Sequence, residues 1–156
     1  MSVTLYFDPD SDADAHDRAH NPSSYDEGVL ELSFFHRRVH FLVDEVDILG
    51  HRKISLLAIG PIGLITIDHA IRAGKARLRL DGGDLFVSRA DDQMLSIESI
   101  HAKGRVTVKY EELRTTWRSF SEDIRQFIAR EFPELHTHPY WGNWLVDGVF
   151  PSRRIL

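Results

Sequence analysis

The sequence predicts an α+β fold in which two helices pack on one face of an antiparallel sheet of about six strands. Three observations predict this fold class. Apolar residues alternate with polar ones in two stretches between residues 29 and 47, and again in four short stretches between residues 75 and 110. Residues 111–131 instead carry their apolar side chains at steps of three and four. The expected element order is β-β-α-β-β-β-β-α.

Two strands, near residues 29–35 and 38–47, are expected at the start of the fold. Leu32 and Phe34 fall on the same side of the first stretch, and the same alternation begins again at Val39 in the second. The polar tripeptide HRR lies between the two stretches. The two strands are therefore predicted to form a hairpin.

Two helices are expected, one before and one after the four short strands. In the first, near residues 62–73, Leu64, Ile67 and Ile71 fall at helical spacing, and Gly74 is the usual left-handed stop. The second covers EELRTTWRSFSEDIRQFIAREF, where two glutamates in the first turn suit the helix dipole. A proline follows this stretch and marks its end.

The four short strands between the helices are predicted to form an antiparallel meander. They are KARLRL, DLFVSR, MLSIESI and RVTVKY, and the joints between them are DGG, ADDQ and HAKG. Each joint carries glycine or aspartate, which favour tight turns. Strands joined in this way are expected to pair with their neighbours in sequence.

The composition is that of one soluble folded domain of 156 residues. Hydrophobic residues make up 42% of the chain and charged residues 28%, which is the ordinary globular range. The chain has no cysteine, which excludes disulfides, thiolate metal sites and a cysteine nucleophile and fits a reducing cytoplasm. No secretory signal is visible, and no apolar stretch approaches the roughly 18 residues of a membrane span. We therefore expect a cytoplasmic protein that does not bind membranes.

Residues 8–27 concentrate the negative charge. They hold seven acidic residues and one arginine, a net charge of −6, whereas the whole chain carries −5. The stretch lacks large aliphatic residues, so we expect an acidic surface loop or partly disordered arm. Nucleic-acid binding needs a cationic face, and this charge distribution argues against it. An acidic arm would instead attract a basic protein, and its candidate contact residues are Asp10, Asp12, Asp14 and Asp17.

The same aspartates raise the question of a calcium loop. With Asp8 as the first ligand, the next three aspartates stand at the alternate positions that an EF-hand uses. Ala13 then occupies the glycine position and Ala19 the position of the bidentate glutamate. Because both diagnostic residues are missing, no calcium site is expected, and no cofactor is predicted.

Nine histidines are many for a chain of this length. A zinc ion needs three or four ligands, and no HExxH or comparable set is present. Histidines that cap or hydrogen-bond are therefore the plainer interpretation. A small metal-dependent or acid–base enzyme stays open as an alternative. Its pocket would bring together His36, His40, Asp68, His69, His136 and His138.

Lys75, Arg77 and Arg79 alternate with apolar residues, so one strand directs a row of cations to one side. The plainer interpretation is the solvated face of a half-covered antiparallel sheet. The alternative is a surface that binds an acidic partner.

The tail stretch HTHPYWGNWL follows the second helix directly and contains a proline and a glycine that permit turns. The simplest expectation is a tail that folds back and closes the core. Tyr140, Trp141 and Trp144 are also suited to anchor a protein interface, because aromatic residues bury a large area at low entropic cost. A third interpretation is a site formed by His136 and His138.

Several stretches between Phe41 and Leu145 resemble a group of small bacterial cytoplasmic domains of unknown function. They are VDEVDIL, RAGKARLRLDGGDLFVSR, VTVKYEEL, FSEDIRQFIAREFPEL and HPYWGNWL. This group is similar in size, acidity and α+β build to immunity proteins that neutralise polymorphic toxins. The resemblance implies no catalytic residues, and residues 8–27 lie outside it.

The function expected from the sequence is a non-enzymatic protein-binding domain, of the immunity type or a similar accessory protein, with a basic partner. The missing catalytic motifs and the concentrated acidic segment support this expectation. A structural homodimer, joined through an exposed edge strand or the tail aromatics, is a third alternative.

Overall fold

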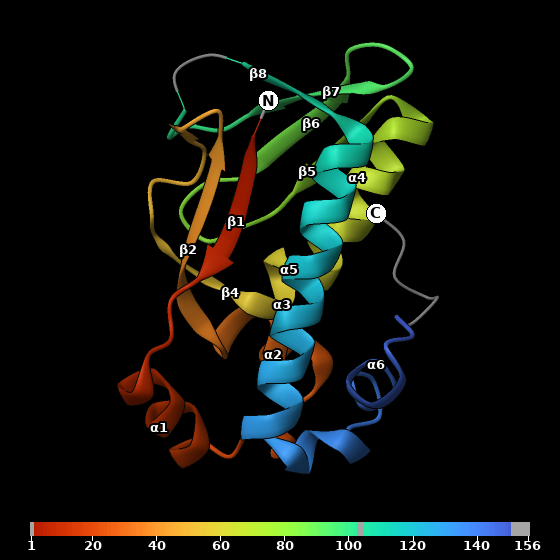
Figure 1. Cartoon of the computed structure of the whole chain (residues 1–156). Helices are drawn as coiled ribbons and strands as arrows, with labels where there is room; N and C mark the ends of the chain where they lie inside the picture. Colours follow the sequence, from red (N-terminus) through yellow and green to blue (C-terminus); the bar gives the residue numbers. More distant parts are fainter. Residues whose placement is uncertain (1, 103–104, 151–156) are drawn as a thin grey trace.

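The computed structural model describes residues 2–102 and 105–150, and it has an α+β fold, as predicted (Figure 1). The β-strands form two antiparallel sheets of four strands each, where one sheet of about six strands was expected. The first half of the chain contains β1 (Val3–Phe7), α1 (Ser11–Ala19), η1 (Pro22–Ser24), α2 (Glu27–Ser33), β2 (His36–Val43), β3 (Val46–Asp47), β4 (Lys53–Ser55) and α3 (Leu56–Ile59). The second half contains α4 (Pro61–Ala73), β5 (Lys75–Leu78), β6 (Leu85–Arg89), β7 (Met94–Glu98), β8 (Val106–Lys109), α5 (Tyr110–Glu131), η2 (Pro133–Thr137) and α6 (Gly142–Asp147).

The first sheet is built around β2, which pairs with β1 along one edge and with β3 and β4 at its two ends. The inward side chains Val39, Phe41 and Val43 are fully buried. The side chains between them point outward, and His40 lies opposite Tyr6 of β1. The strand predicted near residues 38–47 is therefore present as β2, but it ends at Val43, and a turn at residues 44–45 leads into the separate strand β3.

The second sheet is the expected meander, with strand order β5-β6-β7-β8 and antiparallel pairing throughout. Its inner face carries Leu78, Val87, Leu95, Ile97 and Val108, which are all buried. Helix α4 packs on β5 and β6, and α5 contacts β8. The prediction of two helices against this sheet is therefore confirmed.

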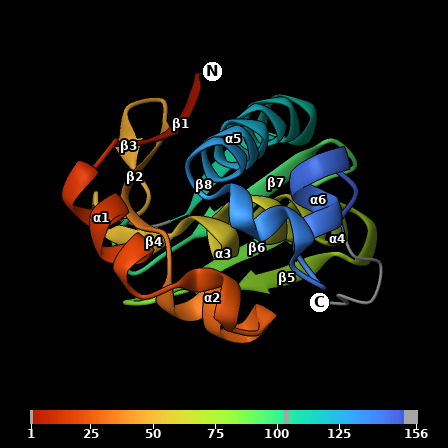
Figure 2. The same ribbon diagram turned by 90° about the horizontal axis from the view of Figure 1, so that it is seen from below.

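Helix α5 joins the two sheets, because it contacts β1 of the first and β8 of the second (Figure 2). Its buried stripe includes Trp117, whose ring lies 5.2 Å from that of Phe41 in an edge-on arrangement. The indole N–H of Trp117 donates to the carbonyl of Ile59 at 2.8 Å. One aromatic residue thus connects α5 to β2 and to α3.

Helix α4 matches its predicted range closely and ends where expected. Gly74 has φ of 98° and its amide donates to the carbonyl of Ala70 at 2.8 Å. This left-handed stop is the conformation that glycine adopts without strain. The strand that follows begins at the next residue.

The prediction of a strand near residues 29–35 is wrong, because Glu27–Ser33 forms α2. The side chain of Asp26 caps this helix by accepting a hydrogen bond from the amide of Val29 at 3.0 Å. Leu30 and Phe34 are four residues apart and both buried, whereas Leu32 is 64% exposed. Residues four positions apart lie on the same face of a strand and also on the same face of a helix. The alternation therefore did not distinguish a strand from a helix here.

Residues 8–27 are ordered into α1 and η1, where a loop or partly disordered arm was expected. Asp10 caps α1 by accepting from the amide of Ala13 at 3.0 Å. The buried Arg37 of β2 binds Asp14 at 2.5 Å and Asp17 at 2.9 Å. The segment folds without large aliphatic residues, and these ion pairs attach the helix to the core.

The apolar stretch Leu56–Ala73, which spans α3 and α4, is long and apolar enough to cross a membrane, contrary to the expectation that no stretch approached that length. However, 61% of this stretch is buried inside the fold. It packs against α5 and the second sheet. It is therefore the core helix of a folded domain, which is consistent with a soluble protein.

Candidate functional site

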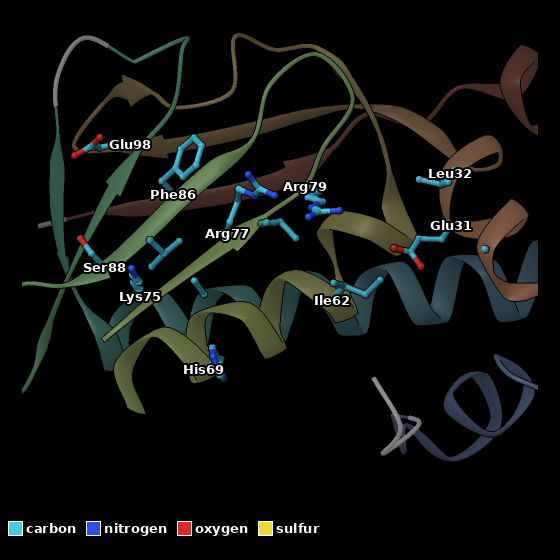
Figure 3. A pocket seen from close by; sticks show the side chains of 14 residues that line it. Glu31, Leu32, Ile62, His69, Lys75, Arg77, Arg79, Phe86, Ser88 and Glu98 are labelled. Carbon is cyan, nitrogen blue, oxygen red and sulfur yellow. The ribbon is translucent and has the colours of Figure 1, made fainter. Parts of the chain in front are cut away.

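A groove of about 1150 Å³ runs beside β5 and is a candidate binding site (Figure 3). Its walls come from α2, α4 and the strands β5, β6 and β7. Lys75, Arg77 and Arg79 lie along one wall, and all three are exposed. The cationic row predicted from the sequence therefore lies within a groove and not on a flat sheet face.

The cations point outward because the apolar residues between them point inward. Leu78 and Leu80 are only 3% and 8% exposed, and strand residues alternate between the two faces. Arg77 lies 3.5 Å from Asp84 across the turn. Among the described residues, the side chains of Lys75 and Arg79 have no hydrogen bond or ion pair. Two of the three cations can therefore bind a ligand without losing a protein partner.

Among residues 2–102 and 105–150, β5 pairs only with β6, so in this part of the chain its backbone is open along one edge. The amide of Arg89 donates to the carbonyl of Gly74 at 2.8 Å, and the register places residues 76 and 78 in the next hydrogen-bonded pairs. The N–H and C=O groups of Lys75 and Arg77 therefore point away from β6. An open edge of this kind is a template for a further strand.

Two apolar side chains complete the groove. Leu32 of α2 is 64% exposed and Phe86 of β6 is 48% exposed, and both line it. Figure 3 shows Phe86 beside Arg77, with Leu32 at the α2 end of the groove. The site thus combines positive charge, an open strand edge and exposed apolar area.

The four aspartates proposed from the sequence do not form one exposed surface. Asp14 and Asp17 bind Arg37, and Asp17 is only 5% exposed. Asp10 caps α1, and the hydrogen bond from the Ala13 amide lowers the pKa of its carboxyl group. Asp12 is exposed in the first turn of the helix. Half of the expected acidic surface is therefore used inside the protein.

The tail aromatics are buried: Tyr140 is 9% exposed, Trp141 1% and Trp144 4%. His138 holds their turn, because its Nδ1 accepts from the amides of Tyr140 and Trp141, each at 3.1 Å. Its Nε2 donates to the carbonyl of Tyr25 at 2.8 Å. In the folded chain these aromatics close the core and do not form an exposed patch.

The six residues of the enzyme alternative do not converge. His36 contacts Asp81, His136 contacts the carbonyl of Ala129, and His138 lies in the tail. His69 lines the groove from α4. Among the described residues, no group of three or more histidine, aspartate or glutamate side chains could hold a metal ion. His40 instead contacts His51, a residue that the sequence analysis did not single out.

Asp68 lies next to His69 but faces α5. Its Oδ1 accepts from the hydroxyl of Tyr110 at 2.7 Å and from Nε of Arg114 at 3.0 Å. Burial of Tyr110 and its hydrogen bond to Asp68 raise the pKa of Tyr110 to about 12. This network connects α4 to α5 and is not part of the groove.

The comparisons with known proteins give no relative. No protein-family model matches the sequence. No curated protein matches it. No solved structure matches the fold. The resemblance to small bacterial domains therefore stays an expectation from the sequence, and the function is inferred from the site alone.

Proposed function

We propose that this protein is a non-enzymatic, cytoplasmic protein-binding domain that holds an extended acidic segment of a partner against β5. The observation that supports this most strongly is the coincidence of an open strand edge with three alternating cations. An added strand would bond to the backbone of Lys75 and Arg77, which gives affinity independent of sequence. Acidic side chains at every second position of that strand would face the cations, which gives specificity.

The charges favour a different chain over a second copy of this one. If two β5 edges paired antiparallel, the cationic rows of both copies would lie opposite one another. Like charges directly opposite on paired strands are destabilising. An acidic partner removes this repulsion, so pairing of β5 with an acidic strand is favoured over pairing with β5 of a second copy.

The immunity-type function expected from the sequence is kept in this proposal, but the proposed partner is acidic instead of basic. An inhibitor or accessory protein needs a surface complementary to its partner, and the groove offers a cationic one. The sequence-based expectation of a basic partner depends on the acidic residues of α1. Asp12 and the partly exposed Asp10 support that second candidate, whereas Asp14 and Asp17 are engaged by Arg37.

The decisive experiment measures binding of a fluorescent nine-residue peptide in which glutamate and valine alternate. We expect wild-type protein to bind it at low salt and more weakly at high salt, because exposed charges are screened. The variant Lys75→Glu/Arg77→Glu/Arg79→Glu is expected to bind at least about tenfold more weakly, since each exposed ion pair contributes about 0.5 kcal/mol or more. Binding unaffected by this variant would exclude the groove.

A matched control changes the same number of charges elsewhere. Lys109, Arg118 and Arg130 are exposed and lie outside the groove. The variant Lys109→Glu/Arg118→Glu/Arg130→Glu has the same net charge as the groove variant, so it is expected to keep most of the binding. Equal losses in both variants would mean that the peptide responds to overall charge.

A capture experiment from native cell lysate distinguishes the two candidate partners. The groove proposal predicts acidic proteins that wild type retains and the groove variant loses. The second candidate predicts a basic protein that Asp10→Asn/Asp12→Asn protein loses. Asparagine caps a helix as well as aspartate does, so this double variant is expected to keep α1 folded.

A further inference from the structure

Four side chains form a continuous polar chain on the outer face of the first sheet. Asp8 Oδ2 lies 2.9 Å from His40 Nε2, and His51 Nε2 lies 3.2 Å from Asp47 Oδ2. Between them, the Nδ1 atoms of the two histidines face one another at 2.5 Å. The order along the chain is carboxylate, imidazole, imidazole, carboxylate.

The carboxylate of Asp8 determines which nitrogen of the His40 ring carries a proton. An ionised carboxylate only accepts hydrogen bonds, so Nε2 of His40 donates to Asp8. In a neutral ring the other nitrogen then has a lone pair and no proton. Nδ1 of His40 therefore presents a lone pair to Nδ1 of His51 across 2.5 Å, and either a proton on His51 or a cation bound between the rings can fill that position.

One of the two rings is held firmly. His40 stands on β2, its side chain is only 13% exposed, and Tyr6 stacks on it with a ring separation of 4.6 Å. Asp47 is also held, because its Oδ1 accepts from the amides of Leu49 and Gly50 at 3.1 and 2.9 Å. The aromatic and carboxylate contacts thus orient the site before any ligand binds.

The other ring has room to adjust. The side chain of His51 is 45% exposed, and the residue lies in the turn before β4 with φ of 54°. Arg38 donates to its backbone carbonyl, which fixes the main chain and leaves the ring movable. The pair therefore consists of one fixed ligand and one adjustable ligand.

We propose that His40 and His51 bind a divalent transition-metal ion of the Zn²⁺ or Cu²⁺ type through their Nδ1 atoms. Imidazole suits these ions, and histidines that bind metal usually donate their other ring N–H to a carboxylate. Asp8 supplies that contact to His40, and Oδ2 of Asp47 lies 3.2 Å from Nε2 of His51. The described residues provide no third ligand, so the remaining coordination positions are open to water or to a ligand from outside.

The geometry requires only a small movement. Tetrahedral zinc with Zn–N bonds of about 2.0–2.1 Å places two nitrogens about 3.3 Å apart. The Nδ1 atoms must therefore separate by roughly 0.8 Å from their present distance of 2.5 Å. Rotation of the exposed His51 ring can supply this. The guanidinium of Arg38 is close to the site and will oppose cation binding, so we expect weaker affinity than in a closed four-ligand site.

The test is calorimetric titration of Zn²⁺ into protein purified without an affinity tag, with native mass spectrometry for stoichiometry. One ion per chain is expected. His51→Ala should weaken binding at least about tenfold, because it removes one of two ligands. Asp8→Ala should weaken it about 10- to 100-fold, the usual effect of removing a carboxylate behind a metal-binding histidine.

The matched control is the other close pair of histidine rings. His16 and His20 lie on α1 with ring centroids 4.2 Å apart. His16→Ala is expected to leave the affinity unchanged. Loss of binding in His16→Ala with retention in His51→Ala would overturn the proposal.

Electron paramagnetic resonance with Cu²⁺ gives a second readout that does not depend on affinity. Two imidazole nitrogens are expected to split the copper signal in wild type, and one in His51→Ala. Circular dichroism of each variant checks that the fold is intact. If folded wild-type protein bound neither ion, the gap between the rings would hold a shared proton only, and the metal proposal would be wrong.

Discussion

At the residue scale, Arg37 is the buried cation that attaches the acidic helix α1 to the first sheet. Its guanidinium is only 1% exposed, binds Asp14 and Asp17, and lies 5.6 Å from the centre of the Phe127 ring. Loss of one partner leaves buried charge without compensation, which typically costs about 3–5 kcal/mol. We therefore expect Arg37→Ala to lower the free energy of unfolding by about 3 kcal/mol or more, measured by urea denaturation.

The control for this prediction is Arg105→Ala. Arg105 binds Glu98 at 2.6 Å, but its side chain is 63% exposed. Exposed ion pairs contribute about 0–1 kcal/mol, so this variant should be nearly as stable as wild type. A similar loss in the free energy of unfolding in both variants would show that the contribution of Arg37 to stability does not depend on its burial.

A second residue-scale prediction concerns alkaline pH. The pKa of Tyr110 is raised from 10.0 to about 12, because burial and the hydrogen bond to Asp68 favour the protonated hydroxyl. A group with a raised folded pKa stabilises the fold fully below its unfolded pKa. This stability is lost as pH rises through the folded value. The free energy of unfolding is therefore expected to fall between about pH 10 and pH 12.

Tyr110→Phe isolates this contribution. The variant lacks the hydroxyl, so its stability should depend less on pH across the same window than that of wild type. Ultraviolet titration of tyrosinate absorption follows the ionisation directly and should lose its latest-titrating component in the variant. Identical pH profiles for the two proteins would contradict the assignment.

At the scale of elements, Gly63 allows α4 to approach α5. A Cβ atom at this position would lie 2.6 Å from Nε1 of Trp117, the atom that donates to the carbonyl of Ile59. Overpacking of a core contact typically costs about 1–3 kcal/mol. Gly63→Ala is expected to destabilise the protein by that amount, as measured by the shift of the thermal midpoint.

Gly28 provides the control, because it also lies in a helix. A Cβ atom there would have its nearest neighbour at 3.6 Å, an ordinary contact. Gly28→Ala should be neutral or stabilising by up to about 1 kcal/mol, since alanine restricts the unfolded chain. If both variants were destabilised equally, the close approach at Trp117 would not be the cause.

The elements that could be predicted from the sequence are those that pair with near neighbours. The meander β5–β8 is joined by short turns, and α5 has an unbroken apolar stripe. The strand β1 could not be predicted because it pairs with β2, where Val39 lies opposite Phe7 but 32 positions further along the chain. The residues next to β1 in the sequence give no sign of this pairing. The apolar residues of α2 fit the period of a strand as well as that of a helix, so the pattern alone predicts a strand there.

The parts of the candidate site that could be predicted are those that lie on correctly predicted elements. The cations of β5 were recognised from strand alternation, but the groove needs α2 as its far wall, and that helix was predicted as a strand. The contact between His40 and His51 crosses a turn and depends on the left-handed backbone at His51. Spacing in the sequence could not reveal either arrangement, because both require the tertiary fold.

At the scale of the whole molecule, the two sheets share one continuous core. Helix α5 contacts β1, β8, α4 and α6, so it connects the first sheet, the second sheet and the tail. Trp117 packs on Phe41 of the first sheet, and α4 beside it packs on the second. Because neither sheet keeps a separate core, both should lose their structure together.

This arrangement predicts a single unfolding transition. The three tryptophans report on different parts, since Trp117 lies between the sheets and Trp141 and Trp144 lie in the tail. We expect tryptophan fluorescence and far-ultraviolet circular dichroism to give coincident midpoints in urea. The double variant Trp141→Phe/Trp144→Phe leaves only Trp117 as a reporter and should give the same coincidence. A fluorescence change that preceded the loss of helical signal in wild type, but not in this variant, would show that the tail unfolds independently.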